Sequence, residues 1–329
     1  MSTTTNDKKG ATKPRYRDQL PQLADELMLT DGGLETTLIF HEGLPLPQFA
    51  AFDLLKDDEG TRVLRRYFDA YAALAQKHGS GFVLESPTWR ANPDWAPLLG
   101  YSLGELDDLN RKAIALLEEL RAAYEPQVFP IVISGCVGPR GDGYSPAETM
   151  KADEAEAYHA RQISVFRDSA ADMVCAITMT YAEEAIGVTR AARSAGMPVA
   201  ISFTMETDGR LPSGQSLADA IAQVDGETDM GPDYFMINCA HPTHFADILE
   251  PGAPWVERIR GLRANASRKS HAELDESTAL DEGDPLELAA QYRELRSLLP
   301  SLNVLGGCCG TDHRHVGEIG AAWFGQTRS

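Results

Sequence analysis

The sequence lacks the features that mark membrane, secreted and nucleic-acid-binding proteins. No apolar run approaches the length of a membrane span, and the polar start of the chain contains no apolar segment of the kind that a secretory signal requires. The chain carries 30 Lys and Arg against 49 Asp and Glu, and the resulting net charge of −19 repels a phosphate backbone. We therefore predict a cytoplasmic protein that binds neither membranes nor nucleic acids, with a flexible N-terminal tail over residues 1–25.

Cysteine is also scarce, with five residues in a chain of 329. So few cysteines do not build a disulfide framework, and in a reducing cytosol they serve as core thiols, reactive thiols or metal ligands. Two of them, Cys308 and Cys309, are adjacent in the stretch GGCCG. Neighbouring Cα atoms lie ~3.8 Å apart, whereas bridged cysteines are usually ~4.4–6.8 Å apart, so a bond between these two is disfavoured.

Several common catalytic motifs are missing as well. The chain has no Gly-x-Gly-x-x-Gly fingerprint, no phosphate-binding Walker loop, no His-Glu-x-x-His pair and no Gly-x-Ser-x-Gly turn. Dinucleotide binding, nucleotide hydrolysis, the common metalloprotease route and serine-hydrolase chemistry therefore have no support in the sequence.

What the chain does contain is a regular alternation of short apolar runs and segments with helical periodicity. Continuous apolar runs are typical of parallel strands that are buried on both faces. The runs span residues 27–33, 81–86, 128–135, 172–179, 198–205, 233–239, 261–267 and 302–307. Eight such repeats predict an α/β fold, a single (β/α)8 barrel of the TIM type over residues 26–325, with a doubly wound open sheet as the alternative.

In such a barrel the carboxyl ends of all strands open at one mouth, and three cysteines fall at strand ends. Cys239 ends the sixth predicted strand, while Cys308 and Cys309 follow the eighth. The glycines of GGCCG allow a twisted backbone that turns both neighbouring sulfurs inward. Three soft thiolate ligands with one open position are typical of a catalytic zinc site.

A plainer interpretation is that these three cysteines belong to the core, since free cysteine is among the most buried residue types. Cys175 lies within an apolar run and is expected in the core, and Cys136 fits a small residue at a tight turn. Four histidines are alternative metal ligands or neighbours of the site: His241, His244, His313 and His315.

One polar and acidic segment, residues 267–285, interrupts the alternation. It is either a solvated surface loop, as charged runs usually are, or a lid, because it follows the seventh strand at the expected mouth. The sequence leaves both interpretations open.

Five stretches of the chain together resemble the homocysteine S-methyltransferase family. They read LTDGGLETTL, SGCVGPRGDGY, SFTMETDGRLPSGQSLADAI, INC and VLGGCCGT, and they follow the family's order from about residue 27 to about residue 320. The family includes enzymes that use betaine or S-methylmethionine and the homocysteine domain of cobalamin-dependent methionine synthase. The resemblance implies a (β/α)8 barrel with Zn2+ held by Cys239, Cys308 and Cys309.

The resemblance also implies a function for the site. Asp31, with the amides of Gly32 and Gly33, matches the segment that holds the amino-acid end of homocysteine. The substrate thiol would bind at the open zinc position, where its pKa falls, and the thiolate would attack an activated methyl donor. The expected product is methionine, and the expected partners are a small-molecule thiol and a methyl donor, with a homo-oligomer left open.

Two positions depart from the family pattern. The aligned pair at the end of the fourth strand reads Ile177–Thr178 where the family carries Glu-Thr, so a carboxylate that meets the substrate ammonium is missing. Arg90 stands where the family has Gln or Tyr, and its guanidinium suits a carboxylate. With these two residues, Thr88 and Asn238 complete the predicted substrate-binding set.

The departures leave alternatives open. The same chemistry could act on a different thiol, or with a sulfonium or ammonium donor that bears a carboxylate. A zinc or redox sensor that uses the three cysteines without turnover is a further alternative, although a sensor needs no shaped pocket.

Overall fold

The computed structural model of the chain describes residues 13–144 and 149–325, and its eight strands close into one parallel barrel in sequence order. All eight predicted strands are present, so the fold is the predicted (β/α)8 barrel and not the open sheet. The strands are β1 (Met28–Leu29), β2 (Gly81–Glu85), β3 (Ile131–Val137), β4 (Met173–Met179), β5 (Val199–Phe203), β6 (Tyr234–Asn238), β7 (Ile259–Ala264) and β8 (Val304–Gly307).

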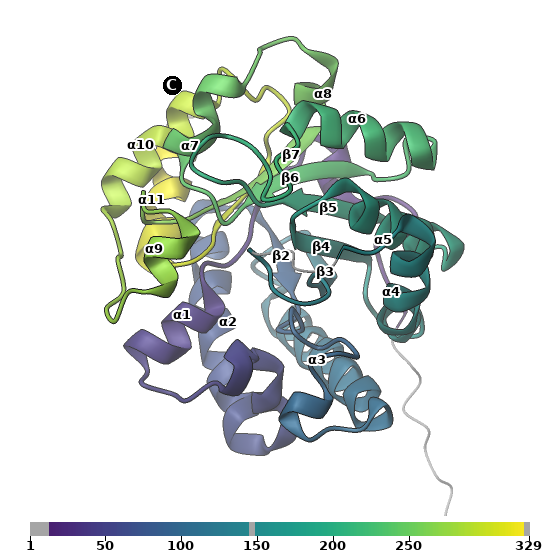
Figure 1. Cartoon of the computed structure of the whole chain (residues 1–329). Coiled ribbons are helices and arrows are strands. Elements are labelled where there is room, and N and C mark those ends of the chain that lie inside the picture. The colour runs from purple at the N-terminus through teal and green to yellow at the C-terminus, as the bar shows by residue number, and fades with distance from the viewer. Residues whose placement is uncertain (1–12, 145–148, 326–329) are drawn as a thin grey trace, which may run out of the picture.

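Helices surround the strands (Figure 1). The helices are α1 (Leu34–Thr36), α2 (Asp58–His78), α3 (Leu103–Tyr124), α4 (Ala152–Arg167), α5 (Ala182–Ser194), α6 (Leu217–Thr228), α7 (Pro242–Phe245), α8 (Pro254–Glu257), α9 (His271–Asp275), α10 (Pro285–Leu295) and α11 (His313–Phe324). None of the helices in the described ranges is both long and apolar enough to cross a membrane.

Helix α2 shows how sequence sets an element of this fold. Asp57 caps its first turn by accepting a hydrogen bond from the backbone of Gly60, and Gly79 ends it with a positive φ of 66°. Its apolar residues recur at three- and four-residue spacing and are buried, as a helix that packs against a barrel requires.

The barrel closes where the short strand β1 pairs with both β2 and β8. Met28 lies opposite Gly81 on one side and Val304 on the other. The chains approach closely here: a Cβ on Gly306 would lie 2.3 Å from Cγ2 of Thr30. Closure therefore brings the turn after β1 next to the turn after β8, at the mouth where the cysteines lie.

Part of the predicted N-terminal tail is packed against the barrel. Leu20 is 1% exposed and joins the buried side chains inside the barrel, and Gln22 is also buried. The backbone N–H groups of Arg15 and Tyr16 donate to Oδ1 of Asp172 over 2.6 and 3.0 Å. The packed structure therefore begins before the predicted boundary at residue 26, while residues 1–12 lie outside the described ranges.

Candidate functional site

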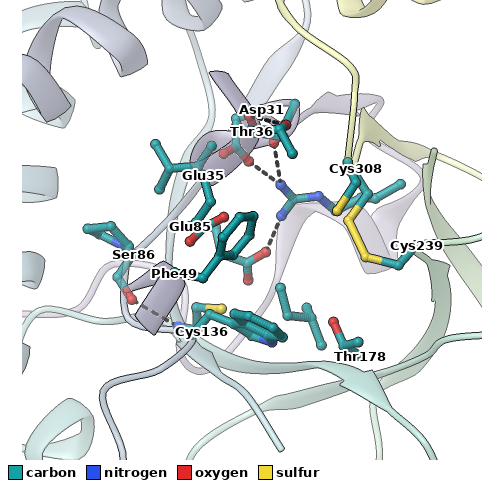
Figure 2. Close-up of a pocket in the computed structure, with 18 of the residues that line it drawn as sticks. Asp31, Glu35, Thr36, Phe49, Glu85, Ser86, Cys136, Thr178, Cys239 and Cys308 are labelled. Carbon is teal, nitrogen blue, oxygen red and sulfur yellow. Dashed lines mark hydrogen bonds and ion pairs between the residues drawn. A yellow bond between two sulfur atoms is a disulfide. The ribbon is translucent and has the colours of Figure 1, made fainter. Parts of the chain in front are cut away.

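Three cysteines meet at the mouth of the barrel. The sulfur atoms of Cys239, Cys308 and Cys309 all lie within 4.8 Å of one another. The structure joins Cys239 and Cys308 in a disulfide, with Cα atoms 5.4 Å apart, and leaves Cys309 free (Figure 2). The adjacent pair is not bonded to each other, as expected, and the convergence predicted from the strand ends is confirmed.

The backbone around these cysteines explains why their sulfurs converge. Cys239 has a positive φ of 52°, and its N–H donates to the carbonyl of Arg263. Of the glycines in GGCCG only Gly310 has a positive φ, of 77°. Gly307 contributes space rather than a positive φ, because a Cβ there would lie 2.1 Å from Oγ1 of Thr311.

An inner pocket of about 60 Å³ lies beside the cysteines, and a buried ion-pair triad lies at its base. Arg263 donates from Nη2 to Asp31 over 2.6 Å and from Nη1 to Glu85 over 2.5 Å, and all three side chains are at most 7% exposed. Burial acts to lower the pKa of Arg263, but the two carboxylates outweigh it and raise that pKa. The triad ties β7 to β2 and to the turn after β1.

The predicted amino-acid-binding segment is already engaged within the protein. The Asp31 carboxylate also accepts from the Tyr67 hydroxyl over 3.0 Å, and the Gly33 N–H donates to the carbonyl of Thr311. A Cβ on Gly33 would lie 2.5 Å from the Cys308 carbonyl oxygen, and one on Gly32 would lie 2.7 Å from a tyrosine hydroxyl. The two glycines therefore let the turn after β1 pack against the cysteine turn.

Glu35 is a residue of the inner pocket that the sequence did not single out. It lies in α1 and lines the pocket together with Ile177. Desolvation raises the pKa of its carboxyl to about 7. Ile177 was predicted at this pocket, and the structure places it there.

Thr88 and Asn238, which were predicted as substrate-binding residues, do not line the inner pocket in the part of the chain that the structure describes. The Thr88 hydroxyl donates to the carbonyl of Cys136 over 2.7 Å. Asn238 accepts at Oδ1 from the N–H of Thr178, whose φ is 62°. Both side chains are fully buried, and each hydrogen-bonds to a residue that lines the pocket.

A second, outer pocket of about 340 Å³ adjoins the inner one. Arg90 belongs to this pocket only, with its guanidinium 4.4 Å from the ring centre of Trp89 and 3.7 Å from that of Trp95. The two pockets share the residues Thr36, Phe49, Trp89, Tyr144 and Cys309. Cys309 therefore lies where the two spaces meet.

The segment 267–285 supplies one wall of the outer pocket, which favours the lid over the solvated loop. It contains α9, where the His271 Nε2–H donates to the carbonyl of Cys239 over 2.6 Å. The His271 ring also lies 4.2 Å from the ring of Tyr144, whose hydroxyl is 3.5 Å from Sγ of Cys239. The segment 267–285 thus lies over the cysteines at the mouth of the barrel.

The four candidate histidines do not join the cysteines. Within the described ranges, the group of potential metal ligands consists of cysteine sulfurs alone. His315 binds Asp312 and the carbonyl of Glu282, His244 binds the carbonyl of Arg268, and burial lowers the pKa of His241 to about 4. Cys136 lines the inner pocket, and Cys175 lies in the barrel interior as predicted.

The barrel and its cysteine-lined mouth define a (β/α)8 protein with a thiol site at the carboxyl ends of the strands. The family model for homocysteine S-methyltransferase matches residues 28–323, and the chain belongs to this family. This result confirms the resemblance read from the five sequence stretches.

Similar proteins agree with the family assignment. The chain is 25% identical to methionine synthase of Mycobacterium leprae over 331 residues and to that of Mycobacterium tuberculosis over 333 residues. These matches cover 93% of the chain, which spans only 25% of the length of each methionine synthase.

Solved structures show the same fold. The homocysteine methyltransferase MmuM from Escherichia coli, in its metallated form, has a TM-score of 0.69 at 19% identity and covers 91% of this chain and 98% of its own. Its oxidised form also has a TM-score of 0.69, at 18% identity, with 90% and 96% covered.

Proposed function

We propose that the protein transfers a methyl group to a thiol with the help of zinc, with homocysteine as the acceptor and methionine as the product. The observation that carries this proposal is the convergence of three cysteine sulfurs within 4.8 Å, at the junction of two pockets. Membership of the homocysteine S-methyltransferase family supports the acceptor. The Escherichia coli protein of the same fold, which was crystallised in a metallated form, supports a metal site.

The cysteines are chemically suited to zinc. Zinc accepts soft thiolate sulfur in tetrahedral sites, and three protein ligands leave a fourth position for substrate. Cys239, Cys308 and Cys309 would hold the ion once the bond between the first two is reduced. When bound, zinc lowers the pKa of a thiol and so supplies the thiolate nucleophile near neutral pH.

The residues of the chain position the acceptor and exclude water. The triad of Asp31, Arg263 and Glu85 fixes the base of the inner pocket, because each of its charges is paired. His271 and Tyr144 close the other end over the cysteines. An acceptor thiol in the inner pocket is thereby held beside the three sulfurs in a space too small for much water.

The outer pocket suits a cationic methyl donor. Aromatic rings and a carboxylate attract sulfonium and quaternary ammonium groups. The pocket offers both, from Phe40, Phe49, Trp89, Tyr144 and Asp275. Arg90 on the same wall would bind a carboxylate carried by the donor. Because Cys309 lines both pockets, the methyl group and the thiol would meet beside it.

The presence of an inner and an outer pocket favours an enzyme over a zinc or redox sensor, since a sensor needs no space for two small molecules. We also infer a cytoplasmic location, because a reducing compartment keeps the three cysteines as thiols that can bind zinc.

Replacement of one cysteine tests the metal site. Purified under reducing conditions, the wild type should contain about one zinc per chain, as an open three-thiolate site would. Cys308→Ser should lose the zinc and the methyl transfer. Cys136→Ser is the matched control, because Cys136 lines the same pocket outside the trio, and it should keep its zinc. Full zinc content in Cys308→Ser would show that the ligand assignment is wrong.

A further inference from the structure

The amino group of an amino-acid thiol needs an anionic partner in the inner pocket. Three carboxylates line this pocket: Asp31, Glu35 and Glu85. An ammonium group bound away from water requires a hydrogen-bonded, oppositely charged partner, so one of these three is the natural candidate.

Two of the three carboxylates are already paired. Arg263 binds Asp31 and Glu85 through separate Nη atoms, and its Nε–H donates to the carbonyl of Gly307 over 3.1 Å. Asp31 accepts two further hydrogen bonds, from Thr30 and Tyr67, each over 3.0 Å. A hydroxyl of Ser134 donates to the other oxygen of Glu85 over 2.9 Å. These two groups complete the pocket base and leave little capacity for a ligand.

Glu35 is the carboxylate that remains. Within the described ranges its side chain forms no hydrogen bond or ion pair with another side chain, and the only hydrogen-bonding group that acts on it is its own backbone N–H. Figure 2 shows it reaching from α1 into the pocket, on the side away from Cys239 and Cys308. Ile177 and Phe49 line the same pocket and offer only apolar contact.

We propose that Glu35 binds the α-ammonium group of the acceptor and selects amino-acid thiols over thiols without an amino group. This assignment rests on the proposed function, which places the acceptor in the inner pocket. Glu35 lines the inner pocket but not the outer one, so its charge faces the acceptor rather than the donor. The acceptor then spans the pocket, with its sulfur at the cysteines and its ammonium group at Glu35.

The raised pKa of Glu35 is consistent with this role. Desolvation raises the pKa of the Glu35 carboxyl to about 7 because it outweighs the attraction of Arg263 and Arg90, neither of which forms an ion pair with it. An incoming ammonium group would supply a directly paired cation. A thiol that lacks the amino group leaves the carboxylate without this partner. A hydrogen bond to a charged group then separates the two kinds of thiol by about ten- to a hundredfold in Kd.

The experiment compares the binding of two thiols to the reduced, zinc-loaded protein by calorimetry. The thiols are homocysteine and 4-mercaptobutyrate, which is homocysteine without its amino group. We expect the wild type to bind homocysteine about ten- to a hundredfold more tightly. The variant Glu35→Gln keeps the shape of the side chain but removes its charge. In this variant homocysteine should bind more weakly, so that the Kd values of the two thiols become nearly equal. Its zinc content and melting temperature should stay unchanged.

Glu42→Gln is the control for the loss of one negative charge, because Glu42 is near in sequence, exposed, and absent from both pocket linings. It should keep the wild-type preference. If Glu35→Gln keeps that preference too, the assignment of Glu35 is overturned while the proposed function stands. If the zinc-loaded wild type binds neither thiol, the proposed function fails and the assignment fails with it.

Discussion

The side chain of Arg263 connects three elements of the barrel at the site. It stands in β7 and pairs with Glu85 at the end of β2 and with Asp31 after β1. Burial raises the pKa of Glu85 even though Arg263 lowers it, so the arginine is what keeps two buried carboxylates together. Its removal would leave two buried carboxylates without their shared cation.

Arg263→Met should therefore destabilise the fold. The loss of one partner from a buried ion pair costs about 3–5 kcal/mol, which urea unfolding measures directly. Arg260→Met is the matched control on the same strand, because its ion-pair partner Asp25 is 84% exposed. The Arg260 side chain also donates to the carbonyl of Gln22 over 3.2 Å, so this variant should cost about 1–2 kcal/mol. Equal losses in the two variants would mean that the triad does not stabilise the pocket base.

The sequence indicated the cysteines of the site but not this triad. The cysteines were found because each falls at a predicted strand end, where a barrel gathers its residues. The pairing of Arg263 with Glu85 depends on which strands face each other across the barrel interior, and a single sequence does not state that register. A signal was present, however, since each is a charged residue inside a predicted strand. Glu35 had no such signal, because an acidic residue in a first helical turn is common.

At the scale of elements, the turns after β1 and β8 act as one unit. The Gly33 N–H donates to Thr311, and the Thr311 N–H donates to the carbonyl of Cys308. Strand β1 was predicted over residues 27–33 but spans only Met28–Leu29, because the chain leaves the sheet early to form this contact. The existence of each strand was predictable from its apolar run, whereas its end was set by such tertiary contacts.

Gly33→Ala tests this unit. The new Cβ would lie 2.5 Å from the carbonyl oxygen of Cys308, so the cysteine backbone must shift, and overpacking of this kind costs about 1–3 kcal/mol. We expect lower zinc content as well as lower stability, measured by metal analysis and urea unfolding.

Gly226→Ala is the control for this prediction. A Cβ at Gly226, in helix α6, meets nothing within 4 Å, so this variant should keep its zinc and gain about 0.4–1 kcal/mol of stability. Full zinc content and unchanged stability in Gly33→Ala would argue against the tight contact between the two turns.

At the scale of the whole molecule, the barrel is covered at both ends. Leu20 and its neighbours pack against one end of the barrel interior, and the segment with α9 covers the mouth at the other. The sequence did not establish that the N-terminal segment and the segment 267–285 pack against the barrel. Both segments are polar, and their packing depends on a few residues such as Leu20 and His271. The barrel itself was predictable, because apolar strand runs alternate with segments of helical periodicity along the entire chain.

This arrangement leaves the two pockets beside the cysteines as the place where a thiol and a methyl donor would react. The most direct measurement is the formation of methionine by the reduced, zinc-loaded protein from homocysteine and small sulfonium or quaternary ammonium donors such as S-methylmethionine and betaine. We predict methionine from at least one of these donors, loss of the activity when a chelator removes the zinc, and its return when zinc is restored. No methionine from any such donor with zinc bound, or an activity that survives complete removal of the metal, would contradict a zinc-dependent thiol methyltransferase.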